Sequence, residues 1–101
     1  MSGSNKIYTK YKTLVEMLNL RQLDVYRIKN NDGKTMEIIR VLDPVTRKVV
    51  NVNLNAVRES LNYVEFLNKI KEGLSAGGVN INERIWKNTI KQAEKIVNKQ
   101  K

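Results

Sequence analysis

The sequence contains neither cysteine nor histidine. Their absence excludes disulfide bonds, zinc modules with thiolate or imidazole ligands, and catalytic pairs of the Ser-His or Cys-His kind. No apolar run approaches the roughly 18 residues that span a bilayer, and no apolar signal core follows the N-terminus. We therefore expect a cytoplasmic protein.

Acidic residues are the remaining candidates for catalysis, and the chain has ten of them. The closest in sequence are Asp32, Glu37 and Asp43, which the pattern places in turns or on a strand face. Because no constellation of paired carboxylates is recognisable, the sequence predicts a protein that is not an enzyme. It also predicts no cofactor and no metal site.

The length of 101 residues, with 41% hydrophobic and 29% charged residues, is typical of one folded domain. We expect residues 1–5 to be disordered and residues 6–101 to form a single α+β domain. The predicted fold consists of an N-terminal helix, a three-stranded antiparallel sheet and two C-terminal helices.

The spacing of apolar residues predicts each element. In chain order we expect a helix over 6–20, strands over 23–29, 35–42 and 48–54, a helix capped by Asn55 and ending near Glu72, and a final helix beginning near Ile81 or Asn82. Asp32-Gly33 and Asp43-Pro44 are typical of the turns between the strands. The second strand is apolar on both faces and is expected to be central. Arg47 is expected to require a positive φ.

A glycine-rich passage covers residues 73–78, with three glycines in six positions. It matches neither the P-loop nor the dinucleotide-binding fingerprint, so it predicts a helix end and an interhelical turn. Asn80 followed by Glu83 resembles a capping box for the final helix.

The chain has 19 Lys and Arg against 10 acidic residues, a formal net charge of +9. In the final helix, apolar and basic residues separate onto opposite faces. The apolar stripe consists of Ile85, Trp86, Thr89, Ile90, Ala93, Ile96 and Val97. The basic row consists of Arg84, Lys87, Lys91, Lys95 and Lys99. This spacing would let the cations follow phosphates along a groove edge.

A second basic surface is expected around the hairpin turns of the sheet. Its members are Arg27, Lys29, Lys34, Arg40, Arg47 and Lys48. Guanidinium groups can make bidentate contacts with phosphate or guanine. The order of three strands and a helix over about residues 23–72 resembles the plan of sheet-reading DNA-binding domains, such as the arm-binding domains of integrases. The resemblance is one of plan, without shared signature residues.

Three aromatic residues stand out. Tyr26, beside Arg27, is a candidate for stacking on bases. Phe66 falls toward the polar side of its predicted helix and suggests a contact surface, whereas Trp86 is expected in the core or an interface.

Together these features favour a small, regulatory DNA-binding or DNA-associated protein, bacterial or from a phage, with DNA favoured over RNA. The alternative is a protein-interaction module, an inhibitor or adaptor, that docks on an acidic partner. Peripheral membrane attachment is less favoured, because the apolar stripe includes Thr89 and Ala93. The lysines could also serve solubility alone. The oligomeric state is left open.

Overall fold

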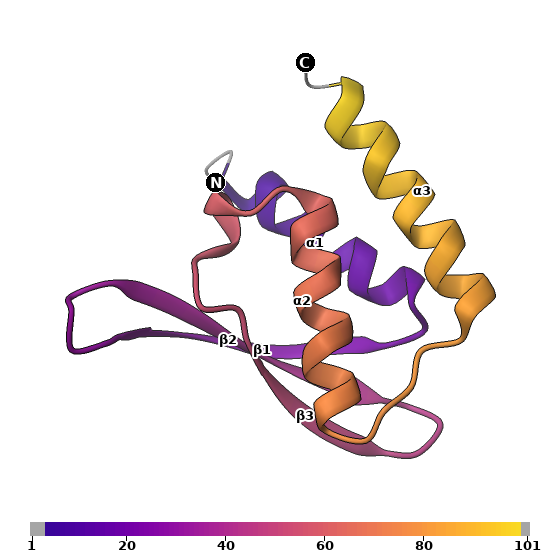
Figure 1. The fold of residues 1–101 in the computed structure, drawn as a ribbon, viewed down its shortest axis with the longest axis horizontal. Helices are drawn as coiled ribbons and strands as arrows, with labels where there is room; N and C mark the ends of the chain where they lie inside the picture. Colours follow the sequence, from indigo (N-terminus) through magenta and orange to yellow (C-terminus); the bar gives the residue numbers. More distant parts are fainter. Residues whose placement is uncertain (1–3, 100–101) are drawn as a thin grey trace.

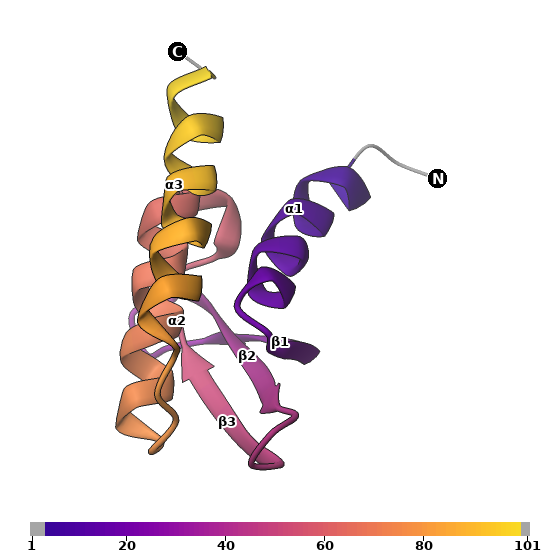
Figure 2. The same cartoon turned by 90° about the vertical axis from the view of Figure 1, so that its right-hand side faces the viewer.

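Three strands form one antiparallel sheet, and three helices lie on one side of it (Figure 1, Figure 2). The computed structural model describes the backbone of residues 4–99 and the side-chain surroundings of residues 8–97. Its elements are α1 (Ser4–Met17), β1 (Arg21–Lys29), β2 (Thr35–Asp43), β3 (Lys48–Asn53), the 3-10 turn η1 (Arg58–Ser60), α2 (Tyr63–Ala76) and α3 (Glu83–Lys99). The predicted α+β fold is confirmed.

β2 is the central strand, as its apolar residues on both faces predict. It pairs along its length with β1 and β3, and the pairing with β1 shifts between Gln22 and Val25, where β1 is bulged. Because each antiparallel turn reverses the chain, the β1–β2 and β2–β3 turns lie at opposite ends of the sheet (Figure 1).

Short polar side chains at the start of each turn shape the two hairpins. Oδ1 of Asn30 accepts a hydrogen bond from the backbone N–H of Asp32 at 2.9 Å. Oδ1 of Asp43 accepts one from the backbone N–H of Val45 at 3.1 Å. Arg47 has a φ of 63°, so the predicted left-handed residue of the second turn is confirmed.

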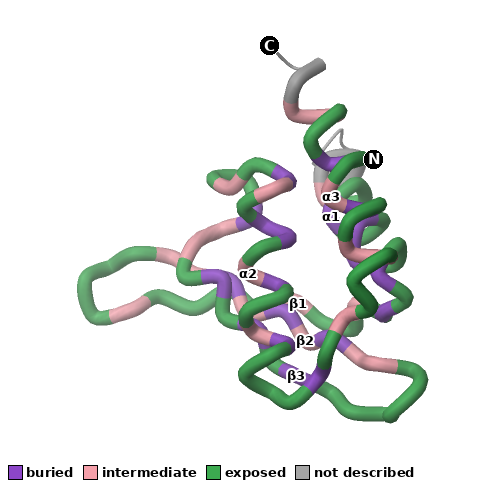
Figure 3. Tube along the Cα trace, turned by 45° about the vertical axis from the view of Figure 1, so that its right-hand side comes forward, coloured by how far each residue is buried: buried purple, intermediate pink, exposed green. Residues whose placement is uncertain are grey.

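The hydrophobic core lies between the sheet and the helices that cover it. Buried positions alternate along β2 and β3 (Figure 3), with Ile39, Val41, Val50 and Val52 facing the helices. α2 packs over β3, α1 packs over β1, and α3 packs against both of these helices. The sheet therefore has one covered face and one face turned to solvent.

The helix that was predicted from Asn55 begins at Tyr63 instead. Asn55 has a φ of 55°, and the chain passes through η1 before the helix starts. Oδ1 of Asn62 then accepts from the backbone N–H of Glu65 at 2.8 Å, and the Glu65 carboxylate accepts from the backbone N–H of Asn62 at 3.0 Å. Because residues 57 and 61 of the predicted stripe lie outside the helix, the buried stripe of α2 is centred differently and consists of Tyr63, Phe66, Leu67, Ile70 and Leu74. Phe66 is fully buried, so its prediction as a contact surface was wrong.

α1 starts and ends earlier than its predicted range. It ends at Met17 because Asn19 adopts a φ of 63°, the left-handed conformation that closes many helices. At its start, Ser4 and Asn5 are helical although they belong to the segment predicted to be disordered. The remaining residues of that segment, 1–3, lie outside the described residues.

The cap of α3 is Asn82, two residues later than the predicted cap. Its Oδ1 accepts from the backbone N–H groups of Arg84 and Ile85 at 2.9 and 3.2 Å. The helix consequently begins at Glu83, and the predicted capping box of Asn80 and Glu83 was wrong.

Two glycines let α2 rest directly on β3. α2 runs past Gly73 to Ala76, with Gly77 as its C-cap residue. A Cβ atom on Gly73 would lie 2.8 Å from Cγ1 of Val52, and one on Gly77 would lie 2.8 Å from Cγ1 of Val50. Gly73, which the sequence suggested as part of the helix end, is thus a packing residue. The helix ends at Ala76, four residues after the predicted Glu72.

Replacing Gly73 by Ala is expected to lower the free energy of unfolding by about 1–3 kcal/mol, because Val52 is buried and stiff and cannot yield to the added methyl group. Thermal denaturation measures this loss. The control is Ser75→Ala on the exposed side of α2, which should change little. In Gly73→Ala/Val52→Ala the clash is removed, so a loss equal to the sum of the single losses would contradict this account.

Glu37 of β2 faces the helices and is fully buried. Its carboxylate accepts hydrogen bonds from Nε and the backbone N–H of Arg58, both at 2.8 Å, and from Nε of Arg27 at 2.9 Å. Burial by itself raises the pKa of Glu37, but the hydrogen bonds from the two guanidinium groups outweigh it and hold the pKa below its usual value. The carboxylate is therefore charged and paired inside the protein.

The network around Glu37 connects α1, β1, β2 and η1. Arg27 also donates to the carboxylate of Glu59 at 2.8 Å and to the hydroxyl of Tyr8 at 3.0 Å. The guanidinium of Arg58 lies 4.1 Å from the centre of the Tyr8 ring. The hydroxyl of Tyr11 donates to the backbone carbonyl of Arg58 at 2.7 Å, and burial raises the pKa of Tyr11 to about 12. These contacts fix α1 and η1 to the sheet.

Glu37→Gln is expected to lower the free energy of unfolding by about 3 kcal/mol, because it leaves Arg58 buried without its counter-ion. Since the pKa of Glu37 is lower in the folded chain than its usual value near 4.5, its contribution is present above that pH and is lost as the pH falls below it. Urea denaturation between about pH 7 and pH 3 measures both effects.

The Glu37→Gln substitution should flatten the acid side of the stability profile as well as lower it. Glu59→Gln is the control, because Glu59 pairs with the same Arg27 but its side chain is 51% exposed, so water screens the pair and its loss should cost much less than that of Glu37. Equal losses for the two variants would contradict a special role for burial.

Candidate nucleic-acid interface

Basic side chains of α3 form a row on the face of the helix that points away from the rest of the protein. Its described members are Arg84, Lys87, Lys91 and Lys95, all of them exposed. At about 1.5 Å per residue, the row is about 17 Å long. Lys99, the predicted fifth member, lies outside the residues whose side chains are described.

The packing of the opposite face of α3 fixes the direction of this row. Thr89 and Ala93 face the core and are 1% and 0% exposed. Oγ1 of Thr89 donates to the backbone carbonyl of Ile85 at 2.9 Å, which satisfies the buried hydroxyl. On the α2 side, Nζ of Lys71 lies 4.7 Å from the centre of the half-buried Trp86 ring. The core therefore holds the basic row on the outer surface.

The cations of the row are not held in ion pairs within the described part of the chain. Its members are three or four residues apart, so like charges repel by roughly a few tenths of a kcal/mol per pair. The ion pairs of the described chain involve Arg27, Arg40 and Arg58 instead. The protein thus pairs these arginines internally, whereas the described cations of the row form no ion pair, although Glu83 and Glu94 lie one helical turn from Lys87 and Lys91.

The cations predicted on the sheet do not share one surface. Arg27 stands opposite Glu37 in the strand register and lies on the covered face, whereas Arg40 lies on the open face. Arg47 and Lys48 are exposed at the β2–β3 turn, the end of the sheet away from the β1–β2 turn. Sequence spacing suggested a cluster, but strand alternation and the two turns separate its members.

Two of these arginines are engaged within the protein. Nη1 of Arg40 donates to the carboxylate of Asp24 at 2.9 Å and lies 3.4 Å from the hydroxyl of Tyr26, whose hydrogen bond is the main cause that raises the pKa of Arg40. The hydrogen bond to Glu37 likewise raises the pKa of Arg27. Tyr26 and Arg27 lie on opposite faces of β1, so they do not form a joint stacking site.

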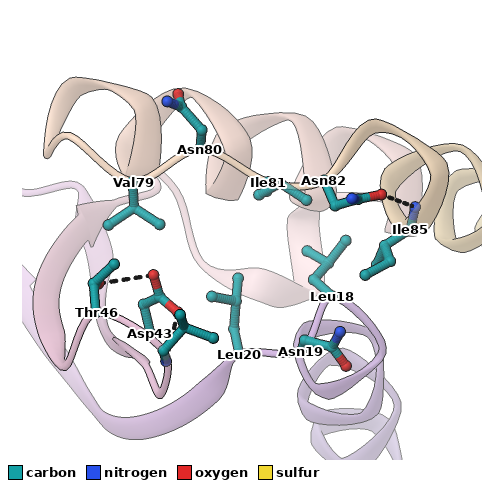
Figure 4. A pocket seen from close by; sticks show the side chains of 11 residues that line it. Leu18, Asn19, Leu20, Asp43, Thr46, Val79, Asn80, Ile81, Asn82 and Ile85 are labelled. Atoms are coloured by element: carbon teal, nitrogen blue, oxygen red, sulfur yellow. Dashed lines mark hydrogen bonds between the residues drawn. The ribbon is translucent and has the colours of Figure 1, made fainter.

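A cavity of about 270 Å³ lies between the end of α1, the β2–β3 turn and the start of α3 (Figure 4). Its apolar walls include Leu18, Leu20, Val79, Ile81 and Ile85. The carboxylate of Asp43 accepts a hydrogen bond from Oγ1 of Thr46 at 2.8 Å, and Asn82 caps α3. Asn19 and Asn80 turn their amides away from the cavity (Figure 4). No set of polar groups converges there as a reaction would require.

Within the described residues, no group of three or more acidic side chains is placed to hold a metal ion. No helix over the same residues combines the length and apolar character needed to cross a membrane.

No protein-family model, no curated protein and no solved structure matches this chain. We therefore infer its function from its own residues, of which the α3 row is the most distinctive group.

Sequence reasoning missed the structural role of Glu37. It treated this residue as a turn or strand-face charge, although alternation in β2 places it on the same face as the buried Ile39 and Val41. That shared face was the available signal. Its two partners, from β1 and η1, could not be read from the sequence because they come from positions 10 and 21 residues away.

Arg27→Met is expected to lower the melting temperature measurably while leaving nucleic-acid affinity within about twofold, because Arg27 is occupied by Glu37 and Glu59. Arg21→Met is the matched control, since Arg21 is exposed, lies outside the proposed interface and takes part in no ion pair of the described chain. Thermal melts and fluorescence anisotropy measure the two quantities. An unchanged melting temperature with a tenfold or larger loss of affinity would instead place Arg27 in the interface.

Proposed function

We propose that this protein binds nucleic acid, duplex DNA in preference to RNA, through the basic row of α3 and without catalysis. The observation that supports the proposal is the row itself, which is exposed, turned outward by the core and, among the described residues, not engaged in ion pairs. A regulatory, cytoplasmic role belongs to the same proposal.

The chemistry of the row favours phosphate contacts over base contacts. Lysine ammonium groups are compact point charges that bind phosphate without reading sequence. A row of about 17 Å covers about half a helical turn of B-DNA, so its cations can follow one edge of a groove. Each contacted phosphate releases counter-ions, and four contacts correspond to a log-log salt slope of about −3 to −4.

The surroundings of the row favour a duplex over single strands. Binding of single-stranded nucleic acid usually depends on exposed aromatic rings beside basic residues. The aromatic residue of α3, Trp86, is half-buried on its packing side and lies under Lys71. Stacking therefore has no platform on the outer face of the described helix.

Of the sheet cations, Arg47 and Lys48 are compatible with an extension of the row. They directly follow Thr46, which lines the same cavity as Asn82 and Ile85 at the start of α3. The β2–β3 turn and the first turn of α3 also lie on the same side of the molecule (Figure 1). The paired Arg27 and Arg40 are not part of the proposed interface.

The triple variant Lys87→Glu/Lys91→Glu/Lys95→Glu is expected to lower affinity for duplex DNA by more than about 100-fold near 100 mM salt, because three phosphate contacts become repulsive. Its salt slope should fall to about −1 or less in magnitude. Its melting temperature should stay close to that of the original chain, since all three side chains are exposed. Fluorescence-anisotropy titrations at several salt concentrations, with duplex DNA, single-stranded DNA and RNA, measure these values.

The matched control is Lys12→Glu/Lys29→Glu/Lys34→Glu, which changes the net charge equally at exposed positions outside α3. This control should keep most of the affinity. Equal losses in both triple variants would show that only net charge matters and would overturn the assignment to α3. If the original chain bound no nucleic acid at low salt, an acidic protein would become the better candidate partner for the row.

A further inference from the structure

The face of the sheet that the helices leave open carries apolar side chains on either side of a polar row formed by Arg40 and Asn51. The strand register places on it Tyr26 and Ile28 of β1, Met36, Ile38 and Leu42 of β2, and Val49 of β3. Tyr26, Ile28 and Val49 are 46%, 41% and 44% exposed. These exposed apolar side chains form two groups, Tyr26 and Ile28 toward the β1–β2 turn and Val49 toward the β2–β3 turn, and exposed apolar groups of this kind are surfaces that a partner can cover.

The central strand is built to be covered on both sides. β2 contributes Ile39 and Val41 to the covered face and Ile38 and Leu42 to the open one. Strands that are apolar on both faces are typical of sheets that have a layer on each side. Among residues 4–99, however, no helix lies on the open face (Figure 2).

The charges on the open face favour a second copy of the same chain as its cover. Arg40 and Asp24 are neighbours on this face, with Nη1 and Oδ2 2.9 Å apart. A base next to an acid is self-complementary about a two-fold axis, because the arginine of each copy can also approach the aspartate of the other. The α3 row belongs to the helical layer on the other side of the sheet, so it does not oppose this contact directly (Figure 2).

The size of the face predicts a weak association. Three strands of up to nine residues form a face of about 14 by 30 Å, or about 400 Å² per copy. Two such faces bury at most about 800 Å², which is below the roughly 1,200 Å² of stable specific interfaces. We therefore expect a weak, transient dimer.

We propose that two copies pack their open sheet faces against each other about a two-fold axis, with the helices of both copies on the outside. The sheets would lie about 10 Å apart, as in other stacked sheets. This dimer is independent of the proposed nucleic-acid binding, and it leaves both α3 rows exposed.

Sedimentation analysis of the whole chain without nucleic acid, from about 5 to 500 µM, tests the proposal. We expect the mean mass to rise from that of one chain toward that of two, with half-dissociation at about 10–100 µM. A mass that stays at one chain up to the highest concentration would overturn the proposal and point to a different partner. Growth beyond two chains would also overturn it, because a face-to-face pair is closed.

Ile28→Glu/Val49→Glu identifies the face, since both side chains are exposed in the single chain and their replacement should preserve the fold, as circular dichroism can verify. We expect it to weaken the dimer at least tenfold. The control Met17→Glu/Val45→Glu makes the same chemical change at exposed apolar residues elsewhere and should leave the dimer unchanged. Equal weakening by both variants, or by neither, would overturn the assignment.

Asp24→Lys provides a second test at a polar position of the same face. It places a cation beside Arg40 in each copy, so the dimer should weaken at least tenfold at low salt and recover in part as salt screens the repulsion. A dimer that forms as well as in the original chain would show that this pair is outside the contact.

Discussion

The buried carboxylate of Glu37 is the interaction on which the arrangement of this domain depends. A charge in the interior is tolerated only when it is paired and hydrogen-bonded, and Glu37 meets both conditions through Arg58 and Arg27. Its partners come from η1 and from the edge strand β1, and the same arginines contact Tyr8 of α1. One carboxylate thereby sets the position of the segments at the start and in the middle of the chain.

This network also decides how the basic residues are used. A guanidinium group has several donors in a fixed plane and can bind two acidic groups at once. Arg27 does so, because it pairs with Glu37 of β2 and with Glu59 of η1. Lysines are strongly hydrated, and those of the row lie on the outer face of α3 because Thr89 and Ala93 occupy the face that packs on the core. The exposed cations of the α3 row are thus available to a partner, whereas Arg27, Arg40 and Arg58 are already paired.

The two candidate contact surfaces differ in chemistry because the sheet separates them. The helical layer presents cations suited to a polyanion, and the open sheet face presents apolar side chains around the pair of Arg40 and Asp24. Since α2 rests on β3 through Gly73 and Gly77, no space remains for a side chain between helix and sheet at those points. The helices cover one face closely and leave the other turned to solvent (Figure 2).

Local patterns were sufficient for the fold class, the order of the strands and the direction of the α3 row, because alternation and helical periodicity follow from the backbone geometry of each element alone. They were insufficient for the start of α2, where a left-handed Asn55 and the turn η1 come before the cap at Asn62, and for the burial of Phe66 that follows from it. Local patterns also could not show which basic residues are held in ion pairs and which are not. Ion pairs join residues that are distant in the chain, so only the tertiary structure decided that Arg27 and Arg40 are occupied while the α3 row is free among the described residues.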